Sequence, residues 1–197
     1  MLTTVSALVL LLLAPGPTNT LLFRAGVLFG FRASWKLAFI ECLAYLLQVT
    51  LWGSALLYLS AYAPWALKLT QLAAGAYLLL VSYQLWLRKK AQDVSIQDRF
   101  TGLSFFWLTV MNPKGLLIAS LIAPINTFTT WAGYLVFMSA LALVVVPVGA
   151  AWIAFGAGVV GRQQGWLSPL AINRVAAIAI GCFATVLLGR LADSIFN

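Results

Sequence analysis

The sequence contains no histidine and only four acidic residues, against twelve lysines and arginines. The lack of histidine excludes imidazole acid–base catalysis and histidine-ligated metals. Paired carboxylates, a serine–histidine set and a glycine-rich phosphate loop of the Walker type are also absent from the sequence. These are the side chains on which hydrolases, metalloenzymes and ATPases depend. We therefore expect a protein that is not an enzyme and that binds no cofactor and no metal.

Cysteine is scarce as well. The two cysteines, Cys42 and Cys182, both lie within apolar stretches. Their spacing matches neither a metal-binding nor a redox motif. We expect both to be small, buried packing residues.

Charged residues make up only 8% of the chain and hydrophobic residues 63%. Soluble domains carry about 25% charged residues, so this chain is predicted to be an integral membrane protein. Residues 115–161 contain no charged side chain, which is enough for two crossings of about 20 residues each. The net charge of +8 does not indicate nucleic-acid binding, because the basic residues lie between the apolar stretches and form no patch.

The apolar stretches and the residues that separate them predict six transmembrane helices in a single membrane domain, 1–197. The first stretch has no basic residues before it, so we interpret it as a retained helix and not as a cleaved signal peptide. The predicted spans are 4–23, 36–61, 64–87, 100–123, 129–160 and 168–191.

Basic residues are concentrated in alternate links between these spans. By the positive-inside rule, the odd-numbered links are predicted to be cytoplasmic and both termini to lie outside. The basic residues in these links are Arg24 and Arg32, then Arg88, Lys89, Lys90 and Arg99, and finally Arg162.

Two proline motifs interrupt apolar spans about half a chain apart. The first is Ala-Pro-Gly-Pro-Thr-Asn at 14–19, and the second is Met-Asn-Pro-Lys-Gly at 111–115. Proline removes a backbone donor and breaks the helical ladder. Broken backbone at membrane depth is tolerated where it is buried in protein or lines a wet cavity. The motifs therefore predict a transport site, with Pro15, Gly16, Pro17 and Asn19 on one side of it.

The two motifs also suggest an internal repeat. Pro17 and Trp35 are separated by the same interval as Pro113 and Trp131, with an offset of 96 residues between the halves. With three spans in each half, about 1–95 and 96–197, the second half must enter the membrane in the opposite sense. That arrangement is a 3+3 inverted repeat with proline-broken helices one and four.

Glu41 is the only acidic residue in any predicted span, and Lys114 follows Pro113 at the start of a half-helix. An ionisable residue inside the membrane usually faces an interior partner or water. Glu41 could carry a proton or hold a substrate ammonium, or it could pair with Lys36 or Arg32 near the interface. Lys114 could bind a substrate carboxylate, or it could pair with Glu41.

Several other polar and small residues are candidates for a role at this site or in packing. Asn112 could cap the half-helix or bind the substrate, and Gln48, two turns beyond Glu41, could face the same cavity. Stripes of small residues permit close helix packing within a monomer or in a homodimer. These stripes are Ala150, Ala154 and Gly158, and Gly181, Thr185 and Gly189.

These features together resemble the lysine exporter (LysE/RhtB) superfamily of amino-acid efflux transporters. The resemblance rests on the Pro-Gly-Pro run and Asn19, the basic link, Asn112-Pro113-Lys114, and a six-span chain of this length. In that family an acid commonly lies about thirteen positions after an Arg-Ala pair. Here that position is Tyr45, and the acid is Glu41, about one helical turn earlier.

The resemblance implies a multi-pass protein of the bacterial inner membrane that exports an amino acid or similar zwitterion, coupled to a proton or cation. Alternating access is the expected mechanism. The substrate-binding residues are expected to be Pro15, Gly16, Pro17, Asn19, Glu41, Asn112, Pro113 and Lys114. Two alternatives remain open at this point: efflux of a metal or organic cation, and a non-transporting membrane subunit of a complex.

Overall fold

The computed structural model describes residues 2–87, 101–124, 126–159 and 169–196, and these residues form helices and short connections without a strand. The elements in chain order are α1 (Leu2–Leu13), α2 (Pro17–Ser34), α3 (Lys36–Tyr62), α4 (Pro64–Leu87), α5 (Gly102–Val110), α6 (Lys114–Leu117), the π-helix η1 (Ile118–Ile122), α7 (Trp131–Val159) and α8 (Pro169–Phe196).

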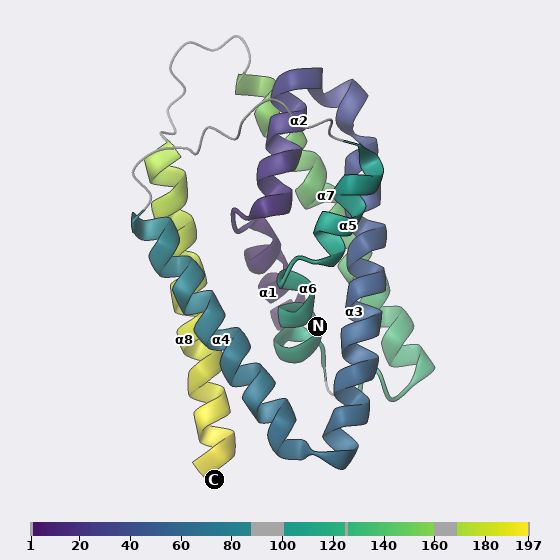
Figure 1. The fold of residues 1–197 in the computed structure, drawn as a ribbon, viewed down its shortest axis with the longest axis vertical. Helices are drawn as coiled ribbons and strands as arrows, with labels where there is room; N and C mark the ends of the chain where they lie inside the picture. Colours follow the sequence, from purple (N-terminus) through teal and green to yellow (C-terminus); the bar gives the residue numbers. More distant parts are fainter. Residues whose placement is uncertain (1, 88–100, 125, 160–168, 197) are drawn as a thin grey trace.

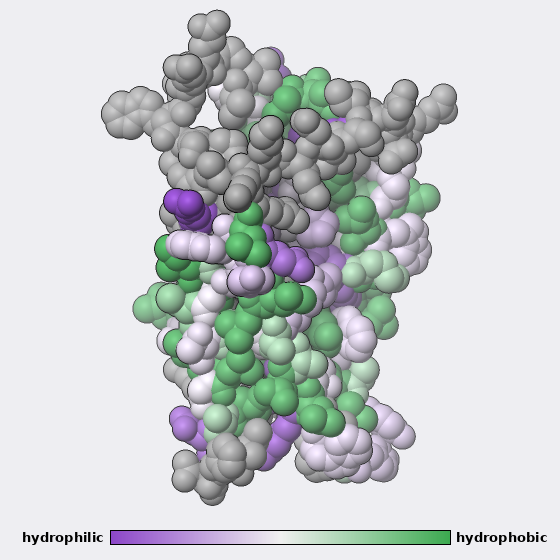
Figure 2. Space-filling view, turned by 60° about the vertical axis from the view of Figure 1, so that its left-hand side comes forward, coloured by the Kyte–Doolittle hydropathy of each residue, from purple (hydrophilic) through white to green (hydrophobic). Residues whose placement is uncertain are grey.

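The helices have the length and composition of an α-helical membrane protein. Two helices, Phe31–Leu59 and Trp131–Gly158, are long and apolar enough to cross a membrane. Two bent pairs, α1 with α2 and α5 with α6 and η1, meet the same criterion if each pair is one span. The described residues thus contain two to four candidate spans, and the number six stays a prediction. On the face shown in Figure 2, hydrophobic side chains fill most of the middle of the molecule.

The helices break at both proline motifs, as predicted. The axes bend by 63° between α1 and α2 and by 45° between α5 and the stretch from Lys114 to Ile122. Pro17 occupies the first turn of α2, where its missing N–H would have no helical partner in any case. The second break separates Val110, the last residue of α5, from Lys114, the first residue of α6.

The predicted end of the first span at residue 23 is wrong. Helix α2 continues through Arg24, and the backbone leaves helical geometry at Gly30, with φ 75° and ψ 169°. A positive φ of this kind suits glycine, because other residues would bring Cβ against the backbone. From Phe31 the chain is helical into α3. Arg24 therefore lies half-buried within a helix, not in a link.

Helix α2 lies along α7, and α4 lies along α8 (Figure 1). Two glycines permit the close approach of α2 and α7. A Cβ on Gly26 would collide with the carbonyl oxygen of Ile153, and a Cβ on Gly156 with that of Phe23. The stripe predicted from Ala154 and Gly158 does not make this contact, since both residues are exposed.

The C-terminal ends of α2, α4 and α7 and the N-terminal ends of α3, α5 and α8 lie at the same end of the molecule (Figure 1). The odd-numbered links therefore leave from one side, as the charge pattern predicts. The basic residues at 88–90, 99 and 162 lie outside the described residues.

Candidate functional site

The two helix breaks meet. The ammonium of Lys114 donates a hydrogen bond of 2.6 Å to the carbonyl oxygen of Ala14. A Cβ added to Gly16 would lie 3.3 Å from Cε of Lys114, so the glycine makes room for the lysine side chain. The amide of Asn112 donates to the hydroxyl of Thr18 at 3.0 Å. Residues from the two halves of the chain therefore form one site.

Asn112 organises the second break. Its side-chain oxygen accepts a hydrogen bond from the backbone N–H of Lys114 at 3.1 Å, which caps the start of α6. Its backbone carbonyl accepts a hydrogen bond of 2.5 Å from the side chain of Gln48 and one of 3.2 Å from the backbone N–H of Gly115. Helix α6 is only four residues long and passes directly into the π-helix η1, a type of turn that is frequent at functional sites.

Asn19 organises the first break. Its amide donates to the carbonyl oxygens of Leu12 at 2.6 Å and Ala14 at 2.8 Å. These carbonyls lie at the end of α1, where the helix supplies no partner. Pro15 and Pro17 are both half-buried, and the two prolines shape the backbone. Gly16 faces Lys114, and Asn19 bonds the Ala14 carbonyl to which Lys114 also donates.

Replacing Asn19 by leucine is expected to destabilise the folded protein by about 1–2 kcal/mol, because two buried carbonyls lose a shared donor. The thermal midpoint of the purified protein in detergent measures this loss. Thr20→Val is the matched control, since Thr20 is exposed and its hydroxyl bonds only the Gly16 carbonyl one turn away. Equal midpoints for the two variants would contradict the role assigned to Asn19.

Glu41 is buried beside these groups, with only 3% of its surface exposed. It lies ten residues after Phe31, the first residue of the candidate span, which is about 15 Å along the helix axis. The groups that act on its carboxylate are the ammonium of Lys114 and the hydroxyl of Thr18. The alternative in which Glu41 pairs at the interface does not fit this position, because Arg32 and Lys36 are exposed.

Gly149 of α7 makes room for the Glu41 carboxylate. A Cβ at this position would lie 2.7 Å from Oε2 of Glu41 and 3.2 Å from Cβ of Ala38. Helix α7 continues unbroken through the nearby Pro147. The carboxylate can therefore be accommodated against the backbone of α7.

The buried polar side chains form a layer between two apolar clusters. The smaller cluster is Leu22, Ala38, Phe105 and Ile153. The larger one includes Leu12, Val49, Leu117 and Val145. Each polar residue lies about one helical turn from members of these clusters. None is more than 8% exposed, so the layer is closed to solvent in this conformation. We call it the polar layer, and its members are Thr18, Asn19, Glu41, Tyr45, Gln48, Asn112 and Lys114.

One acceptor in the polar layer has no partner. Oε1 of Gln48 is buried and makes no hydrogen bond to any residue that the structure describes, although the amide nitrogen of the same side chain is bonded. A Cβ on Gly115 would overlap the Gln48 side chain, so this glycine sets the position of the amide. An unsatisfied buried acceptor costs about 1–3 kcal/mol, and a ligand or water donor would remove that cost.

The structure brings Gly16, Asn19, Glu41, Asn112 and Lys114 together, and the three prolines form the backbone around them. Sequence reasoning missed Thr18 and Gly149. Thr18 corresponds to Lys114 at the repeat offset of 96, and Gly149 follows Pro147 by two positions, so both left a weak signal. Comparison of the chain with protein-family models, curated proteins and solved structures found no match.

Proposed function

We propose that the chain is a secondary transporter that exports an amino acid or a similar small zwitterion, as its resemblance to the lysine exporter (LysE/RhtB) superfamily implies. The observation that carries the proposal is the hydrogen bond between the Lys114 ammonium and the Ala14 carbonyl, inside a sealed layer that also holds Glu41. A buried ammonium that donates to a buried carbonyl just after a helix end makes the contact that the ammonium of an amino acid would make.

In the proposed mechanism the substrate exchanges places with the lysine. The substrate ammonium takes the Ala14 carbonyl, and the released Lys114 ammonium binds the substrate carboxylate. The free Oε1 of Gln48 can accept a further hydrogen bond from the substrate. This exchange keeps every buried charge paired, which matters because an unpaired charge in a dry interior is strongly unfavourable.

Alternating access requires two seals and two related halves. The two apolar clusters on either side of the polar layer are suitable as the inner and outer seals. The contacts between helices support the inverted repeat. In the repeat, α1 corresponds to α5, α2 to α6 and η1, and α3 to α7. The contact of α1 with α7 matches that of α5 with α3, and the contact of α1 with η1 matches that of α5 with α2. Helix α2 likewise contacts α7 as α6 and η1 contact α3. Six spans in a bacterial inner membrane complete this proposal.

A metal substrate has less support. Among the residues that the structure describes, no group of three histidine, cysteine or acidic side chains could hold a metal ion. Glu41 is then best suited to the coupling step, as a carboxylate that is protonated from one side and deprotonated to the other.

The function is tested by flux of radiolabelled amino acids in proteoliposomes, with and without a pH gradient. Glu41→Gln mimics the protonated acid, so we expect gradient-driven accumulation to disappear while exchange of labelled for unlabelled substrate persists. Exchange and gradient-driven accumulation that are both unchanged in Glu41→Gln would contradict the coupling role. Absence of flux for every zwitterion tested would favour the cation exporter or the non-transporting subunit.

A further inference from the structure

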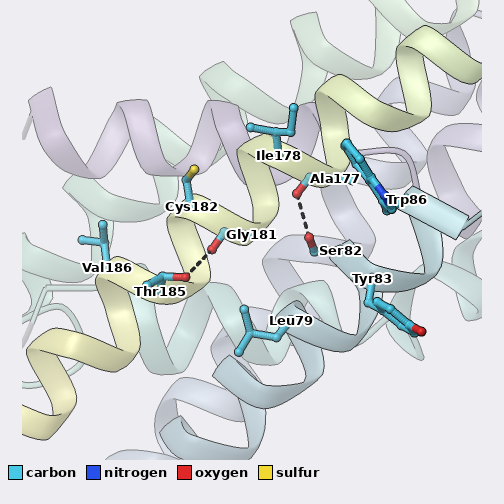
Figure 3. Close-up of a pocket in the computed structure, with 10 residues that line it drawn as sticks. All are labelled: Leu79, Ser82, Tyr83, Trp86, Ala177, Ile178, Gly181, Cys182, Thr185 and Val186. Atoms are coloured by element: carbon cyan, nitrogen blue, oxygen red, sulfur yellow. Dashed lines mark hydrogen bonds between the residues drawn. The ribbon is translucent and has the colours of Figure 1, made fainter.

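An apolar groove of about 640 Å³ lies between α4 and α8, away from the polar layer (Figure 3). We call it the α4–α8 groove. One wall carries Leu79, Tyr83 and Trp86 of α4, and the other carries Ile178, Cys182 and Val186 of α8. Cys182 is exposed, so the expectation that both cysteines are buried is wrong for this one.

Two hydroxyl groups in the groove, those of Ser82 and Thr185, are already bonded. Ser82 donates to the carbonyl oxygen of Ala177 at 2.7 Å, and Thr185 donates to that of Gly181 at 2.9 Å (Figure 3). Gly181 also allows Ser82 to come close, since a Cβ there would lie 2.9 Å from the serine oxygen. The groove therefore offers an apolar ligand mainly hydrocarbon and aromatic surface.

One end of the groove carries a positive charge. The guanidinium of Arg174 lies 5.5 Å from the centre of the Trp86 ring, and Arg174 is exposed one helical turn before Ile178. Of the acids in the described residues, Glu41 is buried in the polar layer. The other, Asp193, lies about 28 Å along α8 from Arg174. Neither can neutralise this guanidinium.

We propose that the α4–α8 groove binds a phospholipid with an anionic headgroup. One acyl chain lies along the groove, whose α8 wall from Ala177 to Val186 is about 13 Å long. The headgroup phosphate binds Arg174, and the Trp86 indole lies at the level of the headgroups, where tryptophan is enriched. Charge complementarity favours a lipid over a second copy of the chain, because the groove joins an apolar length to a single cationic end.

Helices α4 and α8 form the side of the molecule that is on the left in Figure 1, and Figure 2 turns this side forward. The groove on it is open to the surroundings, and Tyr83, Trp86, Ile178 and Val186 are all exposed. If 64–87 and 168–191 cross the membrane, as the sequence predicts, these residues face lipid. The proposal depends on membrane insertion and does not depend on the transported substrate.

Cys182 provides the measurement, because it lies in the groove while Cys42 is buried. The rate of labelling by N-ethylmaleimide is compared in nanodiscs of dioleoyl phosphatidylglycerol and of dioleoyl phosphatidylcholine. We expect labelling to be about fivefold slower in the anionic lipid. One basic residue attracts an anionic headgroup by about 1 kcal/mol, which corresponds to about a fivefold change in occupancy of the groove. Arg174→Gln removes this difference. Arg174→Lys retains part of it, and Arg32→Gln, a control at another exposed arginine, leaves it unchanged.

Three outcomes would overturn the proposal. The first is labelling at the same rate in both lipids, and the second is a difference that survives in Arg174→Gln. The third is a rate that falls with the number of protein copies per disc and not with lipid charge, which would mean that a second copy covers the groove.

Discussion

Replacing Lys114 by methionine is expected to reduce amino-acid flux about 100-fold. Methionine keeps the length of the side chain but removes the ammonium that bonds the Ala14 carbonyl. In the exchange mechanism the same ammonium must then bind the substrate carboxylate. Loss of one partner of a buried charged contact costs about 2–5 kcal/mol, which corresponds to a 30- to several-thousand-fold change. Initial rates of radiolabelled substrate uptake in proteoliposomes measure this effect.

The control for Lys114 is Lys36→Met, at an exposed lysine at the start of α3. It removes the same charge from the chain and should change the flux less than threefold, as expected for a screened surface charge. Removal of Lys114 also leaves Glu41 without its cation, so the double variant Glu41→Gln with Lys114→Met tests whether the protein still folds as a monodisperse species. Flux in Lys114→Met equal to that in Lys36→Met would remove the basis for the proposed mechanism.

Replacing Gly156 by alanine is expected to destabilise the fold by about 2 kcal/mol or more. The added methyl group would collide with the carbonyl oxygen of Phe23, which is a backbone atom of α2 and cannot move without shifting that helix. Overpacking of this kind costs about 1–3 kcal/mol, and a helix–helix contact in lipid depends on such close approach. The midpoint of unfolding in mixed detergent and sodium dodecyl sulfate measures the loss.

Gly158→Ala is the control on the same helix. A Cβ at Gly158 meets nothing within 4 Å, so the substitution adds only the higher helix propensity of alanine, about 1 kcal/mol in favour of folding. The two variants change the same residue type two positions apart, and they should shift the unfolding midpoint in opposite directions. A shift of the same sign and size would mean that the contact between α2 and α7 is not close.

The positions of the helices were largely predictable. Proline restricts the backbone wherever it occurs, so the two broken helices follow from residues 15–17 and 113 without any tertiary information. The end of the first span was not predictable. The charge of Arg24 suggested that the helix ends before it, whereas nothing in the sequence marked Gly30 as the position where the backbone leaves helical geometry. The long side chain of an arginine can reach water from within a helix, so a charge does not have to end the helix. The positive φ of Gly30 depends on the path of the chain into α3, which only the structure shows.

The candidate site was predictable as a set of residue types but not as a set of contacts. Sequence reasoning identified Glu41, Asn112 and Lys114 because charged and amide groups are rare within apolar spans. It expected Lys114 to bind a substrate carboxylate or to pair with Glu41. The ammonium does act on the Glu41 carboxylate, but its hydrogen bond to the Ala14 carbonyl was not predicted. Which backbone group lies opposite a side chain depends on how two bent helices cross, and the local sequence does not encode that crossing.

The sequence alone determined that this chain is apolar and helical and that two of its helices break, since composition and proline act locally. Only the tertiary structure decided that the two breaks touch, that Gly149 makes room for Glu41, and that α4 and α8 leave a groove between them. These three features depend on contacts between residues about 100 positions apart, such as Lys114 with Ala14 and Gly149 with Glu41. Such contacts form only when whole helices pack, and packing is set by the shapes of many side chains together.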